Sequence, residues 1–336
     1  MDDLARGLAP DDLPASDTVA FLLSHYGIVE LSPHWLLVRG TPGDDQELGA
    51  RIAADIVDEL AGAPAARLGV GIARGATEFN VVVALQDKTL ELEPLPRHLA
   101  PGQTAVVAGR LIGRAGPPQL AVTAPSGAVR EIDITDAAAA PADRATRFRG
   151  KFTCQEGPGR YQVEVTGVDA GGPTVLANFP VYCGVEPPRE APGPAGMPRA
   201  PSSGGASVAE AEGAILLLVN RDRAAAGLPP LALDRKLAEV ARAHSGDMAA
   251  HDFVAHVSPT SGTFIDRVVR AGIRPTLLLE NVGRAYTAAD AQRGFMASPV
   301  HRRNVLDRRA THIGIGVAAG KEVSGAAPLF VTQMMM

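Results

Sequence analysis

The stretch that most constrains how this chain can fold is rich in proline and glycine and covers residues 186–206. Its 21 residues, EPPREAPGPAGMPRAPSSGGA, include six prolines and four glycines. Proline removes a backbone donor and glycine weakens both helices and strands, so the stretch can sustain neither. It predicts an extended linker between separately folded regions, and a length of 336 residues independently suggests two or three domains.

Charge and hydropathy exclude some classes of function. Residues 207–336 carry 15 basic and 12 acidic side chains, a net +3, and the rest of the chain carries a net −8. This balance is too weak to indicate nucleic-acid binding. No stretch approaches the roughly 20 apolar residues of a membrane span. The acidic start Met1–Leu4 lacks the pattern of a signal peptide, so the protein is either cytosolic or its export signal is missing from this chain.

Residues 93–185 have the pattern of an all-β module. Short runs such as 104–108, 120–123 and 161–165 are rich in β-forming residues and lie between glycine and proline turns. In the run 161–165, polar Gln162 and Glu164 alternate with apolar residues, the period of a strand with one buried face. We therefore predict an immunoglobulin-like β-sandwich that acts as a spacer or a binding platform.

The two cysteines, Cys154 and Cys183, both lie beside strand-like runs of this module. A disulfide between them would close a loop of about 30 residues and add roughly 3–4 kcal/mol of stability. Two buried free thiols are the alternative. A pair without an odd cysteine favours the disulfide and an oxidising compartment.

Residues 1–92 predict a small α/β region. Ile52, Ile56 and Leu60 have helical spacing, and 80–85 is typical of a buried strand. The run Leu68–Ala73 with that strand parallels Ile313–Ala318 with 329–333, which suggests a degenerate half-copy of the C-terminal fold or a coincidence between glycine-containing strands.

The pattern of residues 207–336 predicts three helices and two closing strands. The first helix covers 209–226, Asp234 caps the second and Thr287 caps a third. Apolar strands follow at 313–317 and 329–333. We expect an α+β domain with helices on both faces of a small antiparallel sheet, an α-β-α sandwich.

An ordered series of motifs makes this region more specific. It runs NRDR (220–223), GLPPL (227–231), Asp234 through Asp247-Met248, HVSP (256–259), DR with AGI (266–273), ENV (280–282), SPVHRRN (298–304) and GIGVA (314–318). The series resembles the bacterial branch of the CAP superfamily, the cysteine-rich secretory, antigen 5 and pathogenesis-related proteins, also called SCP-like. Nothing comparable identifies residues 1–206.

The resemblance implies a polar cleft with two histidines and two acidic residues. His256, Glu280 and His301 match three of these positions. The second acidic position is Ser298 here, which leaves one carboxylate fewer, and Asn281 and Asn304 also line the implied cleft. Because Glu280 follows three leucines, we expect its carboxylate to be partly desolvated and therefore partnered.

Two kinds of chemistry remain open for such a site. His256 and His301 can hold a divalent metal such as zinc, with Glu280 as a further ligand or as the catalytic base for a bound water. Alternatively, the side chains form a metal-free network that binds a polar group. Asn281 and Asn304 are expected to clamp loops, and His244 to pack in the core. Arg302, Arg303, Arg308 and Arg309 predict either a solvated face or contact with an anionic glycan or lipid headgroup.

Two function hypotheses follow. In the first, the protein is a bacterial, exported module, extracellular or periplasmic, that binds a lipid, glycan or cell-wall fragment without turnover. In the second, it is a metal-assisted hydrolase or lyase that acts on an envelope polymer or peptide. The sequence leaves open whether the protein is an enzyme and what its oligomeric state is.

Overall fold

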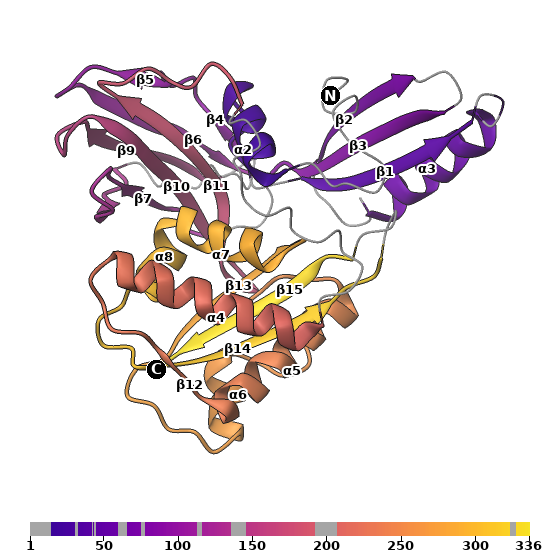
Figure 1. Cartoon of the computed structure of the whole chain (residues 1–336). Helices are drawn as coiled ribbons and strands as arrows, with labels where there is room; N and C mark the ends of the chain where they lie inside the picture. The colour runs from indigo at the N-terminus through magenta and orange to yellow at the C-terminus, as the bar shows by residue number, and fades with distance from the viewer. Residues whose placement is uncertain are drawn as a thin grey trace.

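A computed structural model describes residues 15–30, 33–41, 43, 45–59, 66–74, 78–112, 116–135, 146–191, 207–322 and 327–336 (Figure 1). Three regions follow one another along the chain: a small α/β region, a β-sandwich and an α+β C-terminal domain. Of the predicted linker, residues 192–206 lie outside the described residues, and residues 186–191 form neither helix nor strand.

The N-terminal region is a three-stranded antiparallel sheet in the order β1-β3-β2, formed by β1 (His34–Gly40), β2 (Ala66–Arg74) and β3 (Phe79–Asp87). Helix α3 (Asp45–Glu59) packs Ile52 and Ile56 against one face, and helix α2 (Ser16–His25) contributes Leu22 to the other. Strand β2 is largely exposed, whereas the strand it resembles near the C-terminus is buried. The half-copy relationship therefore stays a prediction.

The β-sandwich consists of two sheets around one core. Strands β4 (Leu90–Leu92), β6 (Thr104–Leu111) and β9 (Arg147–Thr153) form the first sheet. The second has the order β5-β11-β10-β7-β8 and comprises β5 (His98–Leu99), β7 (Gln119–Thr123), β8 (Val129–Ile132), β10 (Gly159–Asp169) and β11 (Gly172–Cys183). Because β4 pairs with β6, the sandwich begins slightly before the predicted boundary at residue 93.

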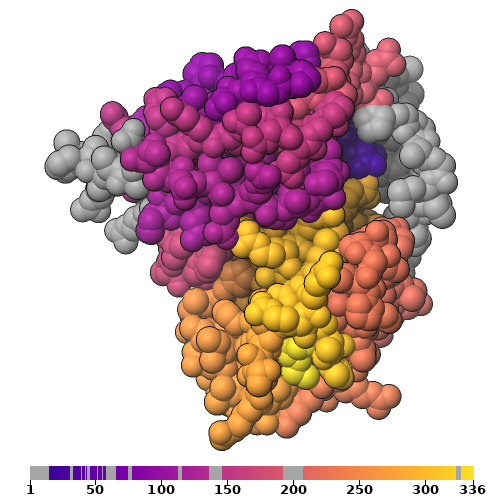
Figure 2. Space-filling view, turned by 90° about the vertical axis from the view of Figure 1, so that its left-hand side faces the viewer, coloured from indigo at the N-terminus to yellow at the C-terminus, as the bar shows by residue number. Residues whose placement is uncertain are grey.

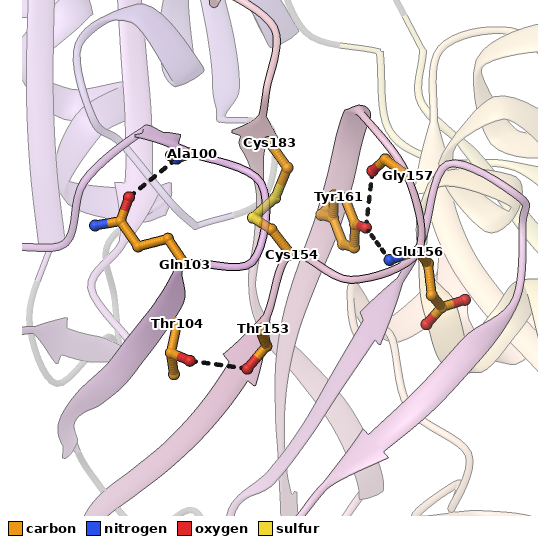
Figure 3. The surroundings of a disulfide bond; sticks show 9 residues. All are labelled: Ala100, Gln103, Thr104, Thr153, Cys154, Glu156, Gly157, Tyr161 and Cys183. Atoms are coloured by element: carbon orange, nitrogen blue, oxygen red, sulfur yellow. Dashed lines mark hydrogen bonds between the residues drawn. A yellow bond between two sulfur atoms is a disulfide. The ribbon is translucent and has the colours of Figure 1, made fainter.

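A disulfide joins the two sheets of the sandwich at one end (Figure 3). It links Cys154, just after β9, to Cys183 at the end of β11, with a Cα–Cα distance of 5.8 Å. Beside it, the Tyr161 hydroxyl donates to the Gly157 carbonyl at 3.0 Å and accepts from the Glu156 amide at 2.9 Å. The alternative of two free thiols is therefore wrong for this structure.

The C-terminal domain has a four-stranded sheet in the order β12-β14-β15-β13. Its strands are β12 (Ala232–Leu233), β13 (Leu279–Ala285), β14 (His312–Ala319) and β15 (Leu329–Met335). Strand β12 is parallel to β14, and the other pairs are antiparallel. The two closing strands were predicted correctly, and β13, which carries Glu280, adds the far edge.

Helices cover both faces of this sheet, which gives the expected three layers (Figure 1). Helices α4 (Val208–Ala225), α7 (Ala288–Ala297) and α8 (Pro299–Val305) pack on one face, and α5 (Arg235–His251) and α6 (Phe264–Arg270) on the other. The predicted caps are present, since Asp234 accepts from the Leu237 amide and Thr287 from the Asp290 amide. The α+β prediction for this domain is confirmed.

Two glycines of β14 allow helix α5 to lie directly on the sheet. A Cβ atom at Gly314 would lie 2.3 Å from the Leu237 carbonyl carbon, and one at Gly316 would lie 2.2 Å from the Ala241 carbonyl carbon. Backbone cannot yield as a flexible side chain can, so any side chain at these positions must displace α5. This contact explains why two glycines alternate in the closing GIGVA motif.

The β-sandwich packs against the C-terminal domain (Figure 2). Contacts join β7 and β10 to α8, and the turn between β10 and β11 to the segment before α6. The sequence predicted that polar residues of β10 face away from the buried side, but Glu164 is 0% exposed. The prediction is wrong at this residue because the other domain covers that face.

We expect Gly316→Ala to lower the free energy of unfolding by about 3 kcal/mol, because the added methyl group pushes α5 off the sheet. Gly246→Ala in α5 is the matched control, since a Cβ atom there meets nothing within 4 Å. It should leave stability unchanged or raise it by up to about 1 kcal/mol. Chemical denaturation measures both, and equal stability of the two variants would contradict the packing described here.

Candidate functional site

Glu280 lies at the centre of a buried network of charged and polar side chains. Its carboxylate, at the start of β13, accepts from His256 Nδ1 at 2.9 Å on one oxygen and from Arg267 Nη2 at 2.6 Å on the other. The side chains of Glu280 and Arg267 are 0% and 4% exposed. The sequence predicted a partnered carboxylate, and the partners are an arginine from α6 and a histidine from the segment between α5 and α6.

Arg267 also fixes the backbone around His256. Arg267 Nη1 donates to the carbonyls of His256 at 3.1 Å and Gly262 at 2.8 Å. A carboxylate bound to a guanidinium can only accept, so His256 carries its proton on Nδ1. When the ring is neutral, this tautomer leaves Nε2 as a hydrogen-bond acceptor on a side chain that is 14% exposed.

The two asparagines of the predicted site hold backbone segments together. Asn304 Nδ2 donates to the Glu280 carbonyl at 3.2 Å and to Asn281 Oδ1 at 2.9 Å. Asn281 Nδ2 in turn donates to the His301 carbonyl at 3.2 Å and to Gln333 Oε1 at 3.2 Å. The asparagines thus tie helix α8 to strand β13, which sets the position of His301 relative to Glu280.

His301 lies on α8, whose first turn is capped by Ser298. The Ser298 hydroxyl accepts from the His301 amide at 3.4 Å, and the His301 ring packs edge-on against Phe295 with centroids 5.3 Å apart. Burial, together with a smaller effect of the nearby His256, lowers the pKa of His301 to about 3. His301 is therefore neutral at physiological pH, and its imidazole offers one donor and one acceptor.

A buried arginine anchors the other end of α8. Arg223, which is 0% exposed, donates to the carbonyls of Val305 at 2.8 Å, Asp307 at 3.0 Å and Ala310 at 3.3 Å. Its Nε donates to the Pro229 carbonyl at 2.9 Å. Helix α8 is thereby held at its start by Ser298 and at its end by α4.

The residues present fit a metal ion poorly. Both oxygens of Glu280 are bound to Arg267 and His256, and His256 Nδ1 is bound to Glu280. Of the predicted metal ligands, only Nε2 of His256 and the neutral imidazole of His301 are then left to bind an ion. Within the described part of the chain, no group of three His, Cys, Asp or Glu side chains is placed to hold a metal. A third protein ligand, which a zinc site ordinarily has, is not among them.

The structure also places the other polar residues that the sequence raised. His244 is fully buried, and its Nε2 lies 2.9 Å from the Ala255 carbonyl oxygen. Of the four arginines near His301, Arg303 pairs with Glu131 of the sandwich at 2.6 Å and Arg309 pairs with Asp307. Arg303 thus faces the neighbouring domain.

Sequence reasoning missed two residues that organise the site, Arg267 and Arg223, and it missed the burial of Glu164. Arg267 and Arg223 lie inside motifs that were recognised, and the expected cost of a lone buried Glu280 was the signal that could have pointed to Arg267. Glu164 gave no such signal, because its burial depends on contact between domains.

A surface hollow of about 620 Å³ lies elsewhere, on the sandwich. It is lined by Glu131, Ile132, Asp133, Thr135, Arg149 and Lys151, and none of the predicted site residues contributes to it. The side chain of His256 is 14% exposed, and His301 is partly buried.

A comparison with known protein families identifies the class of this three-layer C-terminal domain. Residues 216–335 match the model of the CAP, or cysteine-rich secretory protein, family. The domain that they form belongs to this family.

Two curated relatives come from Bacillus subtilis (strain 168). The uncharacterized protein YkwD is 34% identical over 128 residues, which cover 38% of this chain and 50% of YkwD. The uncharacterized membrane protein YlbC is 36% identical over 104 residues, which cover 31% of this chain and 30% of YlbC. The chain therefore spans half or less of the length of these relatives.

Among solved structures, an extracellular protein containing an SCP domain from Bacillus anthracis is similar at 18% identity and a TM-score of 0.35. That match covers 83% of this chain and 91% of the other. No described helix of this protein is both long and apolar enough to span a bilayer.

We expect Arg267→Met to lower the free energy of unfolding by about 3–5 kcal/mol, because it leaves the Glu280 charge buried without its cationic partner. Arg270→Met is the control, since Arg270 lies exposed on the same helix. Adding Glu280→Gln to Arg267→Met should recover part of the loss. Equal effects of the two single variants on the denaturation midpoint would contradict a buried ion pair.

The lowered pKa of His301 also gives a dependence on pH. The unfolded chain takes up a proton on this residue below about pH 6.5, and the folded protein only near pH 3. Acidification through this window therefore favours the unfolded state. We expect the His301 ring shifts in NMR spectra to stay constant from pH 8 to 4.5, and His301→Gln to reduce the loss of stability in acid. A ring that titrates near pH 6.5 would show that the imidazole is not buried.

Proposed function

We propose that the C-terminal domain is a binding module for a lipid, glycan or cell-wall-derived ligand, and that its His256–His301 site holds the ligand without turnover. The observation that carries this proposal is the state of Glu280. Both of its oxygens accept hydrogen bonds, at 2.6 Å and 2.9 Å, from side chains of the protein. A general base must reach the proton that it removes, and the Glu280 side chain is 0% exposed, with both oxygens directed at donors of the protein.

The chemistry of the two imidazoles narrows the ligand. His256 presents Nε2 as an acceptor, and neutral His301 offers one donor and one acceptor. This pattern suits hydroxyl and amide groups, which both donate and accept. A glycan or a peptide-bearing cell-wall fragment has such groups in abundance, whereas a bare anion finds no charged donor free on Arg267, which is committed to Glu280.

A metal-assisted hydrolase or lyase that acts on an envelope polymer or peptide is the second candidate. The observation in its favour is the low pKa of His301, because a metal ligand must be free of its proton. If an ion bound here, His256 and His301 would hold it and it would supply Lewis-acid chemistry. Glu280 could act as base only after leaving a buried ion pair, which makes this candidate the weaker one.

We infer that the protein is exported. Support comes from the paired Cys154 and Cys183, since disulfides persist in oxidising compartments. We also infer that the sandwich is immunoglobulin-like. The order of its strands and the Tyr161 hydroxyl bonded to backbone at the start of β10 support this, because such domains share a tyrosine corner at that place.

Calorimetry of the full chain with a soluble muramidase digest of peptidoglycan tests the proposal. Wild type should bind, and His256→Gln should bind at least tenfold more weakly because it loses the oriented acceptor. His251→Gln is the matched control, since His251 is 54% exposed at the end of α5 and makes no contact with Glu280. Mass spectrometry should find the digest unchanged after incubation.

Two results would count against the binding module. No heat of binding with the digest or with phospholipid vesicles would remove the proposed ligand classes. New products that appear with the wild type, need zinc and vanish in Glu280→Gln and in His256→Ala/His301→Ala would establish the hydrolase instead.

A further inference from the structure

The β-sandwich contacts both segments of the C-terminal domain that carry the histidines of the proposed site. At the first contact, the turn between β10 and β11 lies against the segment that carries His256. The Val257 amide donates to the Gly171 carbonyl at 2.8 Å. A Cβ atom at Gly172 would lie 3.2 Å from His256 Cβ and 3.9 Å from His256 Cδ2. The turn therefore lies beside His256 Cβ, on the Cδ2 side of the ring.

The second contact lies at the start of α8, one residue before His301. Glu164 of β10 accepts from the Val300 amide at 3.1 Å on one oxygen and from Asn178 Nδ2 at 3.1 Å on the other. It also forms a hydrogen bond with the Ser298 side chain, which caps the His301 amide. Asn178 donates in addition to the Ala297 carbonyl at 3.1 Å.

Both contacts come from the same pair of strands, since Glu164 and the Gly171–Gly172 turn belong to the β10–β11 hairpin. One rigid element thus reaches the backbone of both histidine-bearing segments. Ser298 stands where the resemblance implies a second acidic residue, and a carboxylate from the neighbouring domain is bound to it.

We propose that the β-sandwich forms one side of the His256–His301 site. Glu164 is the positioning residue that holds the sandwich against helix α8. The inference rests on the proposed function in that it concerns the same site. It assigns to the sandwich a role beyond that of a spacer, because its docking sets the distance between the two imidazoles and the access to His256 Nε2.

The surroundings of Glu164 make its contact with helix α8 depend on pH. Burial raises the pKa of Glu164 to about 7, against the hydrogen bonds from Ser298, Val300 and Asn178 and the charge of Arg303. Of the elements around it, α8 contributes Arg302, Arg303, which is paired with Glu131 of β8, and the neutral His301. Strands β7 and β11 contribute no charged residue.

The sign of the effect follows from these values. In the docked state Glu164 holds its proton up to about pH 7, and when undocked it releases it near its ordinary pKa of 4.5. Docking therefore binds a proton between these values and weakens as the pH rises through this window. We expect the docking equilibrium constant to fall by at least tenfold between pH 5 and pH 8.

Hydrogen exchange of two amides in the full chain measures docking directly, because the acceptors of Val257 and Val300 lie in the other domain. After correction for intrinsic exchange, their protection should fall together between pH 5 and pH 8 in the wild type. In Glu164→Gln, which keeps an acceptor for Val300 without a charge, protection should be the same at both pH values. The Gly262 amide, bonded to Ser258 within the C-terminal domain at 3.0 Å, is the internal control.

Glu131→Gln is the matched variant, since it removes an exposed carboxylate at the same interface and should leave the pH dependence intact. The proposal is overturned if the protection of Val257 and Val300 in the wild type does not change with pH, or if the two amides change independently. It is also overturned if Glu164→Gln retains the dependence. The experiment contains no ligand, so its outcome is separate from that of the binding test, and the wild-type measurement decides even if Glu164→Gln does not fold.

Discussion

The buried carboxylate of Glu280 is the constraint on which the rest of the site depends. An unpaired charge in this position would cost several kcal/mol, so the fold must bring a cation and a second donor to it. Arg267 and His256 do this from α6 and from the segment before it. Because Arg267 also binds the His256 carbonyl, one ion pair fixes the ring, its tautomer and its backbone at once. Because the Glu280 side chain is 0% exposed, its role is to orient His256, and it does not reach a ligand as a base itself.

His301 is held independently of this ion pair, through the helix that carries it. Asn281 and Asn304 connect α8 to β13, and Arg223 binds the carbonyls at its end. Glu164 binds its start from outside the domain. The two imidazoles therefore lie on separately anchored segments. The β-sandwich contacts both of these segments. Under the proposed function, ligand binding at the site would therefore depend on the way the domains pack.

The C-terminal domain could be predicted well from sequence because its motifs mark local events, such as the cap at Asp234 and the glycines at 314 and 316 that meet α5. His256, Glu280 and Asn304 were found in the same way, and the structure places them in contact through side chain or backbone. Arg267 was missed because pairing across 13 residues depends on tertiary folding. Glu164 was assigned to an exposed face, since a period of two indicates which side of a strand is polar and not what covers it.

The tautomer of His256 tests this account most directly. In ¹⁵N NMR spectra of the full chain at pH 8, the account predicts a protonated Nδ1 and an unprotonated Nε2, and loss of that preference in Glu280→Gln. An Nε2–H tautomer in the wild type would contradict it, because Glu280 would then not be bound to Nδ1–H and the acceptor proposed to face the ligand would not exist.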